Sequence, residues 1–323
     1  LDVPTLQILE HLRERLEAGA VDVGHRFTGH DDATDRLLLR CDRGPHLQGR
    51  APLLAVVLAF GPLACAPSQD DGAPDPEGPD PDDAEAWVEL FNGQDLTGWV
   101  PKIRGEPAGE DARRTFRVQD GLLVVSYDEY DAGAGFEDAF GHLFFDTPFE
   151  AYELIVEYRF VESQFVGGPG GARSNSGVMF HAQAPETMGV DQDFPVSLEV
   201  QFLGGAPEEV RPTANLCTPG THVDIDGEQI TDHCIEAAAP TIPDSTWVST
   251  TLVVRPDGSI MHLVGGDTVL EYSGAVVGGG EANGTTSDAP AAGTSLTGGY
   301  LALQSESHPI QFRRVAIRRL DDD

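Results

Sequence analysis

The sequence predicts an all-β protein, built as a two-sheet sandwich of the jelly-roll type and preceded by a poorly structured N-terminal leader. The chain of 323 residues contains 37 glycines and 23 prolines, residues that break helices and form turns. Between these turn signals, short runs of alternating apolar and polar residues recur, which is typical of half-buried strands. Long runs with helical periodicity are few. Many short strands linked by turns fit two packed antiparallel sheets.

Twelve segments after residue 86 have the strand pattern. The clearest is Tyr152–Phe160, where aromatic and aliphatic residues alternate with charged ones. Asp257-Gly258 separates two further runs and is typical of a hairpin turn. The expected strands are Val88–Phe91, Thr115–Gln119, Leu122–Ser126, His142–Phe145, Tyr152–Phe160, Gly177–Gln183, Val196–Leu203, Trp247–Arg255, Ile260–Val264, Val269–Tyr272, Gly299–Gln304 and Gln311–Arg319.

Three segments are expected to precede a folded domain of residues 87–320. Residues 1–50 hold one run with helical spacing, and we interpret them as a small helical appendage or as the product of a start codon assigned too early. Residues 51–65 form an apolar, signal-like segment that ends at Cys65. Residues 66–86 contain eight acidic residues, repeated prolines and no basic residue, so they are expected to form an extended linker.

The apolar run Ala51–Ala64 has about the length of a signal peptide and follows three arginines. The cysteine at its end resembles the lipidated residue of a bacterial lipoprotein, which predicts a lipid anchor at Cys65 and a periplasmic or cell-surface location. Pro62 and Leu63 depart from the usual pattern before such a cysteine. Ordinary secretion and a buried helix therefore stay open as alternatives. A membrane is expected as a partner only through this anchor, because no apolar stretch reaches about 18 residues.

The charge of the chain restricts its partners. The formal net charge is −34, and Lys102 is the only lysine. Such an acidic chain is not expected to bind nucleic acid or an anionic membrane through bulk charge. We interpret the excess of acid as a contribution to solubility.

A polar surface on two neighbouring strands is the first candidate site. In Pro195–Leu203, Glu199 and Gln201 alternate with apolar residues and share one face. In Ser176–Gln183 the same alternation places His181 opposite the apolar face. If the two strands pair, His181, Glu199 and Gln201 share a surface, which we interpret as the floor of a sugar site.

Other polar residues extend this surface or lie near it. Asn175 and Ser176 directly precede the strand of His181 and add an amide and a hydroxyl group. His142 and Arg159 are weaker candidates for substrate contacts. An arginine at this place would orient a carboxylate or a sugar oxygen, or would pair with a neighbouring acid.

Gln304, Glu306 and His308 form a second candidate group, because alternation places them on one side of their segment. Together with Glu199, the glutamate and the histidine have donor atoms that suit a divalent cation, which would act as a Lewis acid. The alternative is a hydrogen-bonded corner that orders the turn before Pro309. No cofactor is required by the sequence, and a divalent cation is the one candidate.

Cys217 and Cys234 are the cysteines that follow the leader, and they lie 17 residues apart. In an exported domain this pair predicts a disulfide. The loop between them is expected to form a wall of the site. Two thiols without a paired short spacing speak against a zinc site.

Five motifs, taken in order, resemble one known family. They are Glu89–Trp99, Asn175–His181, Glu199–Gln201, Asn215–Thr221 and Gly299–Pro309, and the match runs from about Trp87 to Leu320. These motifs are similar to those of the 3-keto-disaccharide hydrolase domain family, also described as 3-keto-glucoside lyase and 3-keto-glucal hydratase. The resemblance implies a concanavalin-like or jelly-roll sandwich that acts on carbohydrate outside the cytoplasm.

The resemblance also implies a chemistry. The ketone at carbon 3 of the sugar acidifies the hydrogen on carbon 2, a base removes it, and the group on carbon 1 leaves before water adds back. Glu199 is the first candidate for this base and His181 the second, with Glu306 and His308 as further catalytic candidates.

Two other functions stay open. A non-catalytic carbohydrate-binding sandwich would use the same polar face only to bind sugar. A conventional glycosidase would use Glu199 and Glu306 as its two carboxylates.

Overall fold

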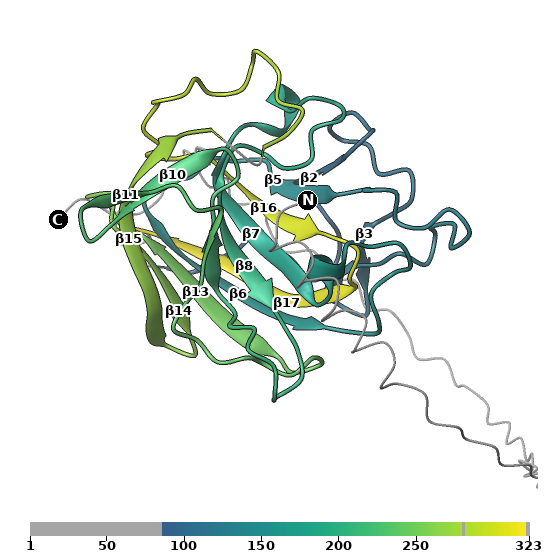
Figure 1. The fold of residues 1–323 in the computed structure, drawn as a ribbon. Helices are drawn as coiled ribbons and strands as arrows, with labels where there is room; N and C mark the ends of the chain where they lie inside the picture. Colours follow the sequence, from purple (N-terminus) through teal and green to yellow (C-terminus); the bar gives the residue numbers. More distant parts are fainter. Residues whose placement is uncertain (1–85, 280–281, 321–323) are drawn as a thin grey trace, which may run out of the picture. The chain divides into compact units, whose positions relative to one another are not determined.

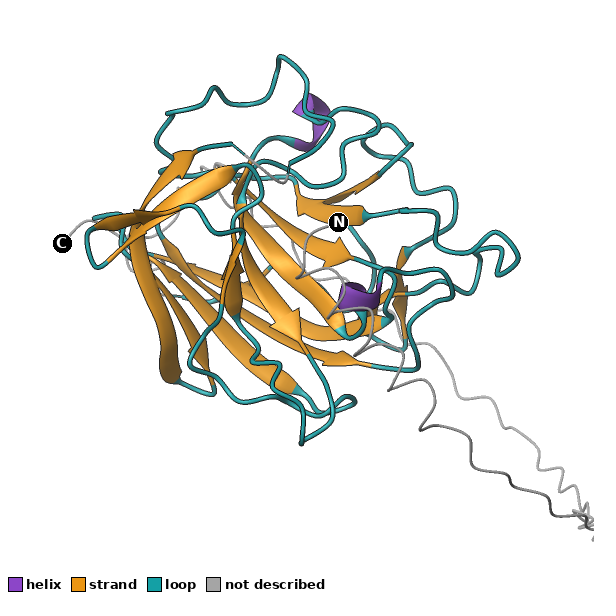
Figure 2. Ribbon diagram, viewed as in Figure 1, coloured by secondary structure: helices purple, strands orange, loops and turns teal. Residues whose placement is uncertain are grey.

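The computed structural model describes residues 86–279 and 282–320. The expectations for residues 1–50, for the signal-like segment 51–65 with its lipidation site at Cys65, and for the linker up to residue 85 lie outside the described residues. The described chain folds into two antiparallel sheets with almost no helix (Figures 1 and 2). Among these residues no helix is long and apolar enough to span a membrane.

The seven-stranded sheet is the one that positions the candidate site. Its strands lie in the order β12, β9, β8, β7, β16, β5 and β2, and each neighbouring pair is antiparallel. The bounds are β12 Cys234–Ile235, β9 Asn215–Cys217, β8 Leu198–Leu203, β7 Asn175–Ala182, β16 Tyr300–Ser305, β5 Gly141–Phe145 and β2 Trp99–Ile103.

The ten-stranded sheet packs against it. Its order is β11, β10, β15, β14, β13, β6, β17, β4 and β3, and β1 pairs with β17. The bounds are β11 Glu228–Ile230, β10 Thr221–Ile225, β15 Asp267–Val277, β14 Ile260–Val264, β13 Val248–Val254, β6 Tyr152–Phe160, β17 Ile310–Arg319, β4 Leu122–Val125, β3 Phe116–Gln119 and β1 Val88–Glu89. Two short 3-10 helices, η2 (Gly170–Ala172) and η3 (Pro185–Thr187), lie in the connections.

Alternation along the strands builds the core between the sheets. Leu198, Val200 and Phe202 of β8 are buried in one apolar cluster together with residues of β6. The ring of Phe202 stacks on that of Tyr158 from the opposite sheet, with 4.0 Å between the ring centroids. Burying apolar surface in this way is the main stabilising contribution to such a fold. The predicted two-sheet β-sandwich is confirmed.

Five strands have no counterpart among the expected segments. Strand β2 contains Pro101 and Lys102, residues that are depleted in strands, and it lies at an edge of its sheet, where a proline is tolerated. Strands β9 to β12 are two to five residues long, too short for a period of two to be recognised.

A β-bulge interrupts the alternation of β7. Tyr300 of β16 pairs with Ala182 and Ala302 pairs with Met179, so two residues of β7 oppose one residue of β16. His181 lies in this bulge with a left-handed φ of 48°. Met179 and Ala182 consequently share one small apolar cluster, although regular alternation predicts opposite faces. The expected alignment of His181 with Met179 is therefore wrong.

Candidate active site

A small pocket lies on the face of the seven-stranded sheet that points away from the core. Its volume is about 60 Å³. Strands β7, β8, β9 and β16 supply most of the wall, and the loop before β8 supplies an aromatic ring. We call this the outer pocket, and its lining residues are Asn175, Phe194, Glu199, Gln201, Cys217, Pro219, His233, Gln304 and Glu306.

The register of the sheet brings the polar side chains together. Glu199 pairs with Met179 on one side and with Cys217 on the other, and Gln201 pairs with Gly177 and Asn215. Because side chains two apart share a face, Glu199 and Gln201 point into the pocket while their neighbours point into the core.

Gly177 makes room for the carboxyl group of Glu199. A Cβ at this position would overlap Glu199 Oε1 and would lie 2.9 Å from the carbonyl oxygen of Val200. No real side chain tolerates such contacts without a shift of its neighbours. The Glu199 side chain therefore lies across β7, directly over the glycine.

Glu199 and Glu306 form a coupled pair of carboxyl groups. Glu199 is only 5% exposed, and burial together with the charge of Glu306 raises its pKa well above the ordinary value. Burial raises the pKa of Glu306 to about 7, against a hydrogen bond from Asn175 that lowers it. Because the charge of Glu306 raises the pKa of Glu199, ionisation of Glu306 makes deprotonation of Glu199 harder. The pocket therefore holds two carboxyl groups that resist ionising together.

The Asn175 side chain fixes one of these carboxyl groups. Its Nδ2 donates a hydrogen bond of 2.6 Å to Glu306 Oε2. Gln201 is held as well, because its Oε1 accepts a 3.1 Å hydrogen bond from Asn215 Nδ2, and Asn215 Oδ1 accepts one from the backbone of Ala237. These contacts set the orientation of two lining side chains before any ligand arrives.

Several polar atoms of this region are buried without a hydrogen-bond partner in the described protein. They are Glu199 Oε1, Asn175 Oδ1, Gln304 Oε1 and His142 Nε2. Buried polar atoms are rarely left unsatisfied, and a ligand with several hydroxyl groups would supply the missing partners. The outer pocket therefore offers several unsatisfied polar atoms to any molecule that carries hydroxyl groups.

Comparison with known proteins identifies the family of this chain. The model of the family described as the 3-keto-alpha-glucoside-1,2-lyase-like domain matches residues 86–318. The chain belongs to this family. No curated protein matches it in sequence.

The solved structures that match this chain share little sequence with it. A Parabacteroides distasonis protein provisionally described as a glycosyl hydrolase is 20% identical, with 74% of this chain and 96% of that chain covered and a TM-score of 0.41. A carbohydrate-binding module from Bacillus subtilis is 8% identical, with 68% and 95% covered and a TM-score of 0.39. A Bacillus subtilis protein of unknown function with a galectin-like fold is 14% identical, with 72% and 94% covered and a TM-score of 0.37.

His142 lies beside the outer pocket of the lyase-like domain and does not line it. It is the strand partner of Gln304, and its ring meets that of Phe194 edge to face at 5.7 Å between centroids. Burial, with the nearby charge of Lys102, lowers the pKa of His142 to about 3, so its imidazole is neutral. Lys102 itself is buried and donates to the carbonyl oxygens of Ile103 and Val190.

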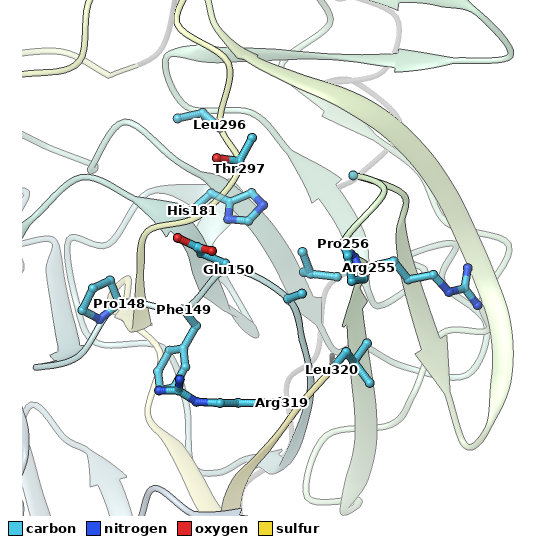
Figure 3. Close-up of a pocket in the computed structure, with 13 residues that line it drawn as sticks. Pro148, Phe149, Glu150, His181, Arg255, Pro256, Leu296, Thr297, Arg319 and Leu320 are labelled. Carbon is cyan, nitrogen blue, oxygen red and sulfur yellow. The ribbon is translucent and has the colours of Figure 1, made fainter. Parts of the chain in front are cut away.

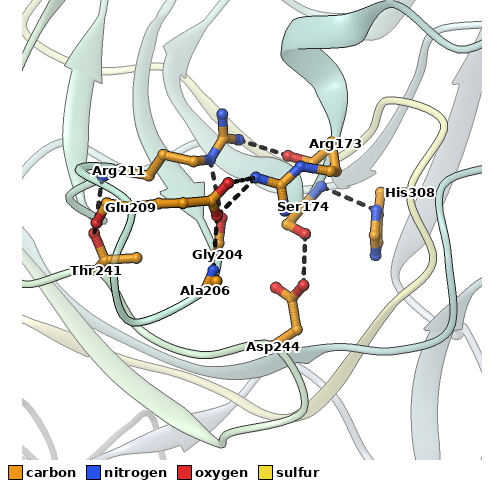
Figure 4. Close-up of polar contacts among 9 residues, drawn as sticks. All are labelled: Arg173, Ser174, Gly204, Ala206, Glu209, Arg211, Thr241, Asp244 and His308. Atoms are coloured by element: carbon orange, nitrogen blue, oxygen red, sulfur yellow. Dashed lines mark hydrogen bonds and ion pairs between the residues drawn. The ribbon is translucent and has the colours of Figure 1, made fainter. Parts of the chain in front are cut away.

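His308 lies outside the pocket, in a polar cluster at the start of β7 (Figure 4). Its Nδ1 accepts a 2.9 Å hydrogen bond from the backbone N–H of Ser174, and the Ser174 hydroxyl donates to Asp244 at 3.0 Å. Ser174 has a left-handed φ of 44°, and Asn175 follows it directly. His308 and Asp244 thus hold the backbone that presents Asn175 to the pocket.

The positions of Glu199, Glu306 and His308 test the divalent-cation site that the sequence suggested. Glu199, Glu306 and His308 do not form a cluster with donor atoms close enough for one ion in the described chain. The group that does is Cys217, His233 and Cys234, and its two thiols are consumed by a disulfide.

Three further candidates from the sequence are directed elsewhere. The hydroxyl of Ser176 donates to the backbone carbonyl of Gln304 inside the sheet, at 2.8 Å. Arg159 belongs to the ten-stranded sheet, where it lies 4.6 Å above the ring of Trp247 and donates to Gln311. His181 lines a different cavity (Figure 3).

The predicted disulfide between Cys217 and Cys234 is confirmed. It joins β9 to β12 next to Glu199, with the two Cα atoms 4.1 Å apart. His233, within the loop that it closes, lines the outer pocket as expected for a wall. Phe194 and Pro219 also line the pocket and were not anticipated, since they lie in loops where no periodic pattern exists.

Proposed function

We propose that this protein is an exported enzyme that cleaves 3-keto-glycosides by elimination followed by hydration, with the outer pocket as its active site. The observation that carries the proposal is that Glu199 and Glu306 line the same pocket, where burial raises the pKa of both and the charge of Glu306 raises that of Glu199 further. Membership of the 3-keto-alpha-glucoside-1,2-lyase-like family supports the choice of substrate.

The elimination step needs one base and one acid. In our proposal the ionised Glu306 removes the proton from carbon 2 of the sugar, and the electron pair forms an enolate with the ketone at carbon 3. The bond between carbon 1 and the leaving oxygen then breaks, and Glu199 transfers its proton to that oxygen. Two carboxyl groups with separated pKa values are the usual arrangement for such paired roles.

Hydration runs through the same two residues in reverse. Water loses a proton to the Glu199 carboxylate and bonds to carbon 1, while Glu306, after exchanging its proton with solvent, delivers a proton to carbon 2. Both carboxyl groups regain their starting states, and the net result is hydrolysis. In our proposal the side-chain amides of Gln201 and Gln304, which line the pocket, donate hydrogen bonds to the enolate oxygen.

The export part of the proposal is supported by the disulfide, because such bonds persist in oxidising compartments. We propose a periplasmic or cell-surface location, with Cys65 as the lipidated residue. Mass spectrometry of the mature N-terminus tests this: a diacylglyceryl-modified Cys65 is expected, and an unmodified chain that begins before Ala51 would contradict export.

The catalytic proposal is tested by turnover of a 3-keto-disaccharide. Glu306→Gln and Glu199→Gln should each reduce kcat by about 10²–10⁴-fold, the usual contribution of a general acid or base. Glu271→Gln on the exposed face of β15 is the matched control. His181→Asn tests the rival base, and it should retain activity within about threefold because asparagine tolerates a left-handed φ.

The same assay separates the alternatives. Rapid release of sugar from an unoxidised disaccharide would support a conventional glycosidase and contradict our proposal. Binding of the 3-keto substrate without any turnover would instead support a carbohydrate-binding module.

A further inference from the structure

A second and larger cavity opens at one end of the sandwich. Its volume is about 610 Å³, within the range of small-molecule sites. Ends of strands from both sheets line it, and it shares no lining residue with the outer pocket. We call it the end cavity; the residues that matter for its chemistry are Phe149, Glu150, His181, Val254, Thr297 and Arg319 (Figure 3).

His181 is the buried polar group of this cavity. It is only 3% exposed, and its Nδ1 has no hydrogen-bond partner in the described protein. Figure 3 shows its ring between Glu150 and Thr297, directed into the cavity. A buried nitrogen without a partner is costly unless something that enters the cavity satisfies it.

The local backbone is arranged to place this imidazole. The bulge of β7 turns His181 away from the face that carries the outer pocket, at the price of a left-handed φ. Gly299 of the neighbouring segment makes the bulge possible, because a Cβ there would lie 2.5 Å from the backbone carbon of His181. The left-handed conformation of His181 and the close approach of Gly299 together fix the position of the His181 side chain, which the proposed mechanism does not use.

The other lining groups indicate what would bind. Burial lowers the pKa of His181 to about 4, so its ring is neutral and can both donate and accept a hydrogen bond. Glu150 at the rim accepts hydrogen bonds, Thr297 donates and accepts, and Arg319 donates from its place 5.6 Å above the ring of Phe149. The lining carries one carboxylate, Glu150, and two guanidinium groups, Arg255 and Arg319, so charged groups of both signs are available as hydrogen-bond partners.

A sugar fits this combination of groups. Each ring carries several hydroxyl groups that donate and accept, and it also has apolar C–H faces. The hydroxyl groups match the neutral imidazole and the mixed rim, and the apolar faces match the wall formed by Val254, Leu296 and Leu320. We propose that the end cavity is a second, non-catalytic sugar-binding site, with His181 hydrogen-bonded to a sugar hydroxyl. It contains no pair of carboxyl groups and therefore lacks the acid and base of the outer pocket.

Calorimetry with trehalose, a disaccharide that is not oxidised at carbon 3, tests this site on the intact chain. The double variant Glu150→Ala/Thr297→Ala changes only exposed rim residues and should fold normally. We expect it to raise the Kd for trehalose by about 10-fold or more, and Glu271→Ala to leave the Kd unchanged. His181→Asn should also weaken binding, since it removes the imidazole and keeps the bulge conformation.

Three results would overturn the proposal. The first is that the wild-type protein does not bind trehalose up to about 50 mM. The second is that the rim and His181 variants bind trehalose as the wild type does. The third is that Glu199→Gln abolishes binding, which would place the sugar in the outer pocket. The double variant should turn over a 3-keto-disaccharide at the wild-type rate. Failure of the second sugar site is thereby distinguished from failure of the proposed function.

Discussion

The outer pocket and the end cavity are built on the same strand, β7, and they differ in how regularly that strand alternates. Around Gly177 the alternation is intact, and the register with β8 sets Glu199 over the glycine. At His181 a bulge reverses the alternation and sends the imidazole to the opposite side of the sheet. One inserted residue in β7 therefore separates the His181 imidazole from the Glu199 carboxyl group, which a regular strand would have placed on the same face of the sheet.

The chemistry of the two regions differs accordingly. The outer pocket has a small volume, two coupled carboxyl groups and fixed amides, which suits proton transfer at one position of a substrate. The end cavity is about ten times larger and has one neutral imidazole among apolar walls and a mixed rim, which suits binding. Backbone register, more than residue type, decides which histidine or glutamate of this sheet reaches the outer pocket.

Gly177→Ala is expected to have the largest effect on the outer pocket. The added methyl group would overlap Glu199 Oε1 and the Val200 carbonyl oxygen, so the carboxyl group must move. We expect activity to fall about 100-fold and stability to fall by about 1–3 kcal/mol. Urea unfolding and turnover measure the two effects.

Gly170→Ala is the control, because a methyl group there meets nothing within 4 Å. It should leave turnover and stability unchanged. Wild-type activity in Gly177→Ala would show that the Glu199 carboxyl group need not lie where the structure places it.

The second largest expected effect is the change in the free energy of unfolding with pH. Glu306 has a pKa of about 7 in the folded protein and an ordinary value near 4.5 when unfolded, so the folded state binds more protons between these values. Stability should therefore fall as pH rises from about 5 to about 8, by at most about 3 kcal/mol because Glu306 is only partly buried. Glu199 acts in the same direction, and the slope should shrink in Glu306→Gln. A free energy of unfolding that rises over this range in wild type would contradict the raised pKa.

Asn175→Ala should have the smallest effect. The hydrogen bond from Asn175 lowers the pKa of Glu306, so its removal should raise that pKa and move the acidic limb of the activity profile to higher pH. Asn283→Ala, at an exposed loop position, should leave the profile in place. If Asn175→Ala moves the limb to lower pH, the contact does not act on the catalytic carboxyl group.

The sequence predicted much of the fold because period two is a strong signal in long strands. The bounds of β6 and β14 agree with the expected Tyr152–Phe160 and Ile260–Val264 residue for residue. The same signal predicted that Glu199 and Gln201 share a face, and that Gln304 and Glu306 share one. These side chains meet in the outer pocket because the register of the sheet aligns their strands.

The remaining placements depend on features that alternation does not encode. His181 is displaced by the bulge, and His308 turns away because Ser307 before it has a left-handed φ of 73°. Arg159 lies on a strand of the other sheet, and sequence alone does not assign strands to sheets. Phe194 reaches the pocket from a loop.

Reaction in D₂O tests the central claim most directly. If Glu306 removes the proton from carbon 2 and later returns one from solvent, the sugar released from a 3-keto-disaccharide should carry one deuterium at carbon 2. The rate of its appearance should follow turnover in wild type and be lost with Glu306→Gln, while substrate kept without enzyme corrects for spontaneous exchange. Released sugar with no deuterium at carbon 2 would contradict elimination, and with it the role assigned to the outer pocket.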